Sequence, residues 1–214
     1  MSILSPALLG AVGLVLLASA AAHLRSPAAL RRGLDAHGVL PPGARGPVAL
    51  VLGPLEALLG AGALVTAVID VPSGVALAVS MPIAGLFLAF TLYLGQVLRA
   101  AQGRVVPCAC GLGEAPVSRT AVLRGGILTT LALVGGVSAD GWSLAGAPAA
   151  EAGVALAAML VIALSVALLP AARAVPEAAI RREAGIHHEL GGQNLPKNAR
   201  RASKTSPKMG GEHR

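Results

Sequence analysis

The stretch GVALAVSMPIAGLFLAFTLYLGQVL, residues 74–98, decides the fold class because none of its 25 side chains is charged. An α-helix crosses the core of a lipid bilayer with about 20 apolar residues, so an uncharged run of this length is typical of a membrane span. Pro82 lies inside the run, where a membrane helix tolerates proline because neighbouring groups satisfy the freed carbonyl. The stretch therefore predicts a kinked but continuous transmembrane helix.

Four further runs have the same character, and they cover residues 3–22, 46–69, 120–139 and 152–172. Across the whole chain of 214 residues, 55% are hydrophobic and only 13% are charged, which is too apolar for an ordinary soluble domain. Arg124 lies in the first turn of the run 120–139, and we expect its long side chain to snorkel to the membrane surface. The sequence predicts an all-α fold, a polytopic integral membrane bundle of about five helices.

The basic residues are sorted between the connections and therefore predict the orientation. Lys and Arg residues follow the first and third runs and are frequent in residues 173–214. The other two connections contain no Lys or Arg, and their charged residues are Asp70, Asp140 and Glu151. Because cytoplasmic loops are enriched in Lys and Arg, we predict a plasma-membrane protein with the N-terminus outside and the C-terminal tail in the cytoplasm. The formal charge of +7 then reflects orientation, and nucleic acid is not an expected partner.

Three segments outside or at the ends of the spans have their own signatures. Ser26 and Pro27 predict the cap and first position of a short surface helix that continues over residues 28–36.

Residues 173–214 are basic, lack apolar periodicity and are predicted to be largely disordered. The His187-His188 pair in this tail has no spaced partners for a metal site. The small residues before Ala22 leave a signal peptide as an alternative for the first run, although a basic n-region is missing.

Both cysteines of the chain lie in one motif, Cys108-Ala109-Cys110. Two thiols one residue apart can form only a tight disulfide, and strained disulfides exchange readily. Arg104 and Arg119 nearby favour the thiolate, which is the reactive form. The motif therefore favours a redox pair that cycles between dithiol and disulfide. Two alternatives remain open: the thiols pack as small apolar residues, or they bind a soft metal such as Cu(I) in a non-catalytic assembly protein.

Glu56 is the only carboxylate inside an apolar run. At about 1.5 Å per residue from Pro47, it lies roughly 13 Å into the membrane, a depth that favours a function over a contact with the surface. The second span begins on the side where the third ends, so Glu56 shares a leaflet with the cysteines and can carry the protons that thiol oxidation releases. A solute transporter built on Glu56 is a further alternative. Tyr93 and Gln96 are polar groups on the same approach, and Tyr93 also fits an interface anchor.

In its order of features the chain resembles the methylamine-utilisation MauE family, which is grouped with DoxX-like redox-associated membrane proteins. Four stretches carry the resemblance, and they are AHLRSPAAL at 22–30, GPLEALLG at 53–60, GRVVPCACG at 103–111 and VSRTAVLR at 117–124. It extends from about residue 1 to about residue 172. The family pattern Cys-x-Cys-Phe-Gly lacks its Phe here, because Gly111 follows Cys110 directly.

The resemblance implies a component of a thiol–disulfide oxidoreductase that helps an exported protein acquire its disulfides. Cys108 and Cys110 would be its redox pair, and the implied partners are the lipid bilayer and a thioredoxin-like or disulfide-containing protein. Methylamine metabolism itself does not follow from it. No cofactor is evident, and a quinone is compatible with this chemistry but is supported by no sequence motif. The charge pattern places the cysteines at the cytoplasmic edge, so either their loop enters the bundle or electrons cross the membrane.

Overall fold

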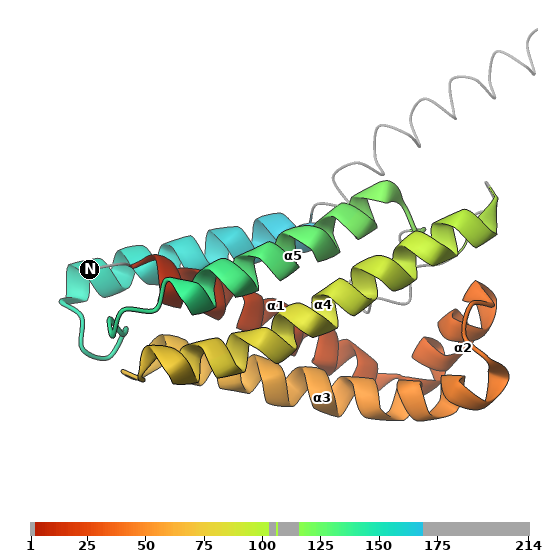
Figure 1. Ribbon diagram of the computed structural model, residues 1–214, viewed down its shortest axis with the longest axis horizontal. Coiled ribbons are helices and arrows are strands. Elements are labelled where there is room, and N and C mark those ends of the chain that lie inside the picture. Colours follow the sequence, from red (N-terminus) through yellow and green to blue (C-terminus); the bar gives the residue numbers. More distant parts are fainter. Residues whose placement is uncertain (1–2, 103–105, 107–115, 169–214) are drawn as a thin grey trace, which may run out of the picture. The chain divides into compact units, whose positions relative to one another are not determined.

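The computed structural model describes residues 3–102, 106 and 116–168 of the chain. Within this part of the chain, five helices are long and apolar enough to cross a membrane, as predicted (Figure 1). They are α1 (Leu4–Arg25), α3 (Pro42–Val68), α4 (Ser73–Ala101), α5 (Arg119–Val137) and a further helix, Ala149–Leu168. The all-α membrane fold is therefore confirmed.

The helices differ from the apolar runs mainly at their ends. α3 begins at Pro42, four residues before the predicted span, and α4 continues to Ala101, past the end of the predicted span at Leu98. A helix ends where its backbone hydrogen bonds end, and these continue into the polar border of a membrane. α4 also passes through Pro82 without interruption, as predicted. The tail predicted for residues 173–214 lies outside the described residues.

The predicted surface helix is α2, Pro27–His37. Pro27 occupies its first turn, where a missing N–H costs nothing, and Gly38 ends it with a left-handed φ of 66°. Ser26 occupies the N-cap position, as predicted, although its side chain forms no capping hydrogen bond. Leu30 and Leu34 on one face of α2 are buried against the start of α3, so α2 lies across that end of the helix.

α1 is the most buried of the five spans and packs along α3 and also on α5. The inner face of α3 is a stripe of small residues interrupted by one carboxylate, with residues spaced three or four apart: Ala49, Gly53, Glu56, Gly60, Ala63 and Ala67. At the closest approach, a Cβ added to Gly60 would lie 3.0 Å from the Gly13 carbonyl oxygen, and the reverse also holds. Small residues allow membrane helices to approach this closely, and here they bring α1 up against Glu56.

α4 packs mainly on α5 by the same means. Gly136 of α5 faces Ser80 of α4, and Gly125 faces Thr91, with no room for a Cβ at either glycine. The outward faces carry large apolar side chains that are more than half exposed, among them Leu50, Leu58, Leu92 and Val137. Exposed apolar faces on long apolar helices fit a lipid bilayer environment.

We expect Gly60→Ala to destabilise the bundle, because the added methyl group would lie 3.0 Å from the backbone carbonyl oxygen of Gly13 and push the two helices apart. The matched control is Gly85→Ala on α4, where nothing lies within 4 Å of the added Cβ. In mixed micelles, unfolding by SDS should show a loss of about 1–3 kcal/mol for Gly60→Ala and little change for Gly85→Ala. Equal stability of the two variants would contradict the close α1–α3 contact.

Candidate functional site

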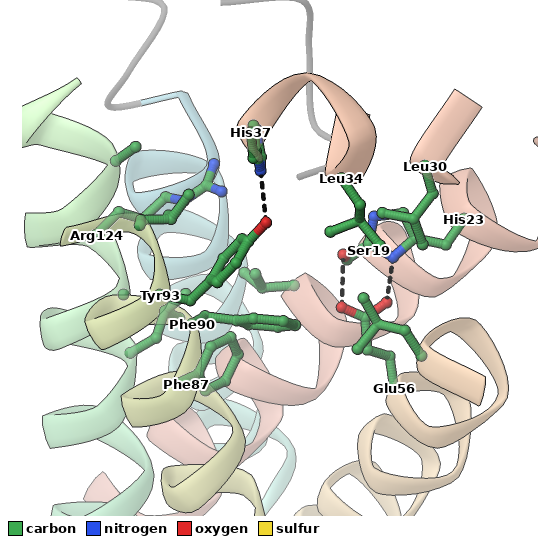
Figure 2. A pocket seen from close by; sticks show the side chains of 16 residues that line it. Ser19, His23, Leu30, Leu34, His37, Glu56, Phe87, Phe90, Tyr93 and Arg124 are labelled. Atoms are coloured by element: carbon green, nitrogen blue, oxygen red, sulfur yellow. Dashed lines mark hydrogen bonds and ion pairs between the residues drawn. The ribbon is translucent and has the colours of Figure 1, made fainter. Parts of the chain in front are cut away.

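Glu56 is fully enclosed, with 1% of its surface exposed, and both of its carboxylate oxygens have partners on α1. Ser19 Oγ donates to Glu56 Oε1 at 3.0 Å, and His23 Nδ1 lies 2.7 Å from Glu56 Oε2 (Figure 2). Ser19 and His23 are four residues apart, so they lie one turn apart on the same face of the helix. α1 therefore supplies both hydrogen-bond partners of a carboxylate that belongs to α3.

The glycines of α3 explain how these short side chains reach each other. Gly53 and Gly60 lie on the same face as Glu56, one turn before and one turn after it. A Cβ added to Gly53 would lie 3.4 Å from the Cβ of His23. The backbone of α1 is thus close to α3 on both sides of Glu56, and the contact positions His23 and Ser19 without long side chains.

Burial makes the pairing of Glu56 with His23 energetically important. An isolated carboxylate in an apolar interior is very unfavourable, and pairing with a hydrogen-bonded cation offsets much of that cost. A proton can lie on the imidazole, giving an ion pair, or on the carboxyl, giving a neutral pair, with the same total charge. The pair can therefore hold a proton inside the membrane and exchange it with a neighbouring group.

The Glu56–His23 pair borders an open-mouthed cavity of about 80 Å³. Side chains from α1 to α5 line it, and the lining is mostly apolar: Val15, Leu30, Leu34, Leu52, Phe87, Phe90, Leu94, Ala121, Gly125 and Leu128. The polar members are few, and they are Ser19, His23, His37, Glu56, Tyr93 and Arg124. An apolar cavity with a few convergent polar groups is the usual form of a small-molecule site.

His37 and Tyr93 join α2 to α4 at this cavity. His37 Nδ1 and the Tyr93 hydroxyl share a hydrogen bond of 2.9 Å, and the two ring centroids are 5.6 Å apart (Figure 2). Tyr93, expected either on the approach to the cysteines or as an interface anchor, lines the cavity. Gln96, the other residue expected on that approach, is exposed and is not part of the lining.

Arg124 corrects one expectation from the sequence. Its side chain does not extend along the outer surface of the bundle but is 8% exposed and lines the cavity. The reason is the face of α5 that turns inward, which carries Ala121, Arg124, Gly125 and Leu128. Small neighbours at 121 and 125 leave room for the arginine inside the bundle.

Cys108 and Cys110 lie outside the described residues, so their role stays a prediction. The structure does describe Val106 and Val117, which precede and follow the cysteines in the sequence. Val117 N–H donates to the Val106 carbonyl oxygen at 2.9 Å, which brings the two ends of that segment together. These ends belong to the connection between α4 and α5, the helices that carry Tyr93 and Arg124.

Residues 1–138 match the family model described as methylamine utilisation protein MauE. The chain belongs to the MauE family. The match covers α1 to α5 and every residue that lines the cavity, but it stops before the helix Ala149–Leu168 and so is shorter than the expected resemblance to residue 172. No curated protein and no solved structure matches the chain.

In this member of the MauE family, the sequence predicts Glu56 as a site residue but does not predict its partners, Ser19 and His23. Ser19 and His23 are a polar pair four residues apart in a mostly apolar helix, a spacing that could have indicated an inward-facing polar patch. His23 also lies in the stretch 22–30 that carried the resemblance. No local signal marks His37, which meets Tyr93 only because α2 folds back over the cavity.

We expect His23 and Glu56 to stabilise the fold jointly. Replacing either residue by Ala leaves the other buried without this partner, whereas replacing both removes the pair. A double-mutant cycle on the unfolding free energy should give a coupling of about 1–3 kcal/mol. The control cycle is Arg45 with Asp35, an ion pair of 3.1 Å whose Asp35 side chain is 49% exposed, and its coupling should stay below about 1 kcal/mol. Similar coupling in the two cycles would contradict the importance of burial.

Proposed function

We propose that this protein is a membrane component of thiol–disulfide exchange that works on an exported partner through Cys108 and Cys110. Membership of the MauE family and a membrane fold support the setting. The observation that carries the proposal is the buried Glu56–His23 pair, a proton-holding group next to the helices that the cysteine segment connects. Buried ionisable groups inside a membrane bundle usually mark such a function.

In the proposed reaction, a thiolate of the partner attacks one sulfur of the Cys108–Cys110 disulfide and forms a mixed disulfide. The second thiol of the partner then attacks this bond, which leaves the partner oxidised and Cys108 and Cys110 reduced. To act again, the two thiols give up two electrons and two protons to an acceptor. The Glu56–His23 pair takes part in this last step by receiving the protons in turn.

Two further polar side chains of the cavity extend this proposed proton path. Tyr93 and Arg124 lie on α4 and α5, and both line the same cavity as Glu56. In the proposed path, a proton released by the cysteines reaches the Glu56–His23 pair by way of the Tyr93 hydroxyl. The orientation proposed from the charge pattern places this end of the bundle at the cytoplasmic face, with the N-terminus outside.

The redox cycle is tested by the oxidation state of the two cysteines in membranes that contain the protein. A large maleimide should shift the protein on a gel only after reduction, and a brief incubation without reductant should restore the unshifted form. Cys108→Ser and Cys110→Ser should each abolish this change, because a single thiol cannot form the intramolecular disulfide. Thiols whose oxidation state never changes would contradict the proposal. Loss of bound Cu(I) from the Cys108→Ser protein would favour the metal-handling alternative.

The proposed orientation gives a second test, in a protein with both cysteines replaced by Ser. Asp70→Cys and Asp35→Cys place single thiols at exposed positions, because Asp70 follows the end of α3 and Asp35 lies on α2, which packs at the start of α3. In intact cells, a membrane-impermeant maleimide should label Asp70→Cys and leave Asp35→Cys unlabelled until the membrane is opened. Labelling of Asp35→Cys alone would reverse the orientation.

A further inference from the structure

Arg124 is a buried cation of the cavity that the proposed reaction does not use. Its side chain is more than nine-tenths buried and extends from α5 into the cavity (Figure 2). Among the residues that the structure describes, no carboxylate forms an ion pair with it. A guanidinium has only donors to offer and keeps its charge when buried, so it requires an acceptor that brings a negative charge.

The other polar groups of the lining do not balance this charge. Both carboxylate oxygens of Glu56 already have partners on α1, and the Glu56–His23 pair, which shares one proton, is neutral overall. His37 and Tyr93 share a hydrogen bond and add no negative charge. The lining therefore carries the positive charge of Arg124, and a bound monoanion would neutralise it.

The size and the walls of the cavity limit which anions fit. Its volume is about 80 Å³, which is about half that of an engineered protein cavity of roughly 150 Å³ that holds benzene. It therefore admits a group of a few heavy atoms and no ring. The walls beside Arg124 are apolar, with Ala121 and Leu128 on the same face of α5 and Phe87 on α4. Such walls favour a singly charged organic anion over phosphate or sulfate, which carry more charge and present only oxygen atoms.

We propose that this cavity binds a carboxylate, whose two oxygens accept hydrogen bonds from the Arg124 guanidinium. A guanidinium presents two parallel N–H groups that match two carboxylate oxygens, and such charge-assisted pairs are about twice as strong as neutral hydrogen bonds. The carbon next to the carboxylate contacts the apolar walls. The inference goes beyond the proposed function, because it requires neither a redox step nor a cysteine.

Two kinds of molecule carry this chemical group. A short organic acid of the size of acetate enters the cavity whole. A fatty acid from the membrane inserts only its carboxylate and leaves its chain outside the open mouth of the cavity. Both make the same contact with Arg124, so competition between acetate and a long-chain acid distinguishes them.

The test uses the full-length protein in phosphatidylcholine nanodiscs and chloride-free buffer, with radiolabelled acetate as the probe in a scintillation proximity assay. Wild type should bind acetate, and acetamide, a neutral molecule of the same shape, should not compete. Arg124→Gln should weaken binding about 10–100-fold, because the charge-assisted hydrogen bonds are lost. Arg119→Gln is the matched control and should bind as wild type does, since Arg119 is exposed at the start of the same helix.

A second variant fills the cavity and leaves Arg124 in place. Ala121 is buried and lines the cavity three residues before Arg124, so the two methyl groups added by Ala121→Val should also weaken acetate binding. Arg124→Lys keeps the charge but loses the planar fork, and it should retain part of the affinity. Folding of each variant is checked by size-exclusion chromatography, and Ala121→Val keeps the test valid if Arg124→Gln fails to fold.

Two outcomes support the inference and identify the source of the carboxylate. Displacement of acetate by oleate assigns the site to membrane fatty acids, and acetate binding that oleate does not affect assigns it to short organic acids. A protein with both cysteines replaced by Ser should bind acetate normally, so failure of the proposed redox function leaves this result intact.

Four outcomes overturn the inference. They are a wild type that binds neither acetate nor oleate, equal binding by Arg124→Gln, Ala121→Val and wild type, loss of binding when the two cysteines are replaced, and displacement of acetate by chloride or acetamide at equal concentration. The last result would mean that the site recognises charge alone or shape alone.

Discussion

The hydrogen bonds between Glu56 and its two partners on α1 are the constraint on which the rest of the structure depends. A carboxylate in the middle of a membrane bundle must be paired, and here the pairing fixes how α1 lies on α3. The stripe of small residues on α3 makes that contact possible, because Gly53 and Gly60 allow the two backbones to approach on either side of Glu56. The same stripe of residues on α3 therefore determines both the α1–α3 packing and the position of Glu56.

The other helices complete the site around this contact. α2 folds back over the end of α3 and closes the cavity with Leu30, Leu34 and His37, while α4 contributes aromatic rings and α5 contributes a buried arginine. The outer surface remains apolar, as a bilayer requires, and the polar groups are concentrated inside. In this member of the MauE family, a buried carboxyl–imidazole pair and an apolar cavity therefore lie next to each other within the bundle.

The sequence predicts the fold well because membrane spans depend on average hydropathy, which the runs at 3–22, 46–69 and 74–98 report directly. It predicts Glu56 because a carboxylate is costly to place in a membrane span and usually faces the interior of the bundle. It fails for Arg124, since hydropathy does not reveal which face of α5 turns inward, and for His37, whose contact with Tyr93 depends on how α2 folds back. The cysteine pair stays a prediction from spacing and family resemblance, since Cys108 and Cys110 lie outside the described residues.

The central claim is that the buried pair of α1 and α3 serves the chemistry of the cysteines, and the rate of disulfide formation tests it most directly. Native membrane vesicles are reduced, the reductant is removed, and Cys108 and Cys110 are trapped with maleimide at increasing times. Glu56→Gln keeps the shape of the side chain but cannot carry the proton, so the account predicts reoxidation slower by about 100-fold or more than in wild type. The exposed control Asp35→Asn should reoxidise at the wild-type rate. Equal rates for Glu56→Gln and wild type, with both proteins folded, would contradict the account.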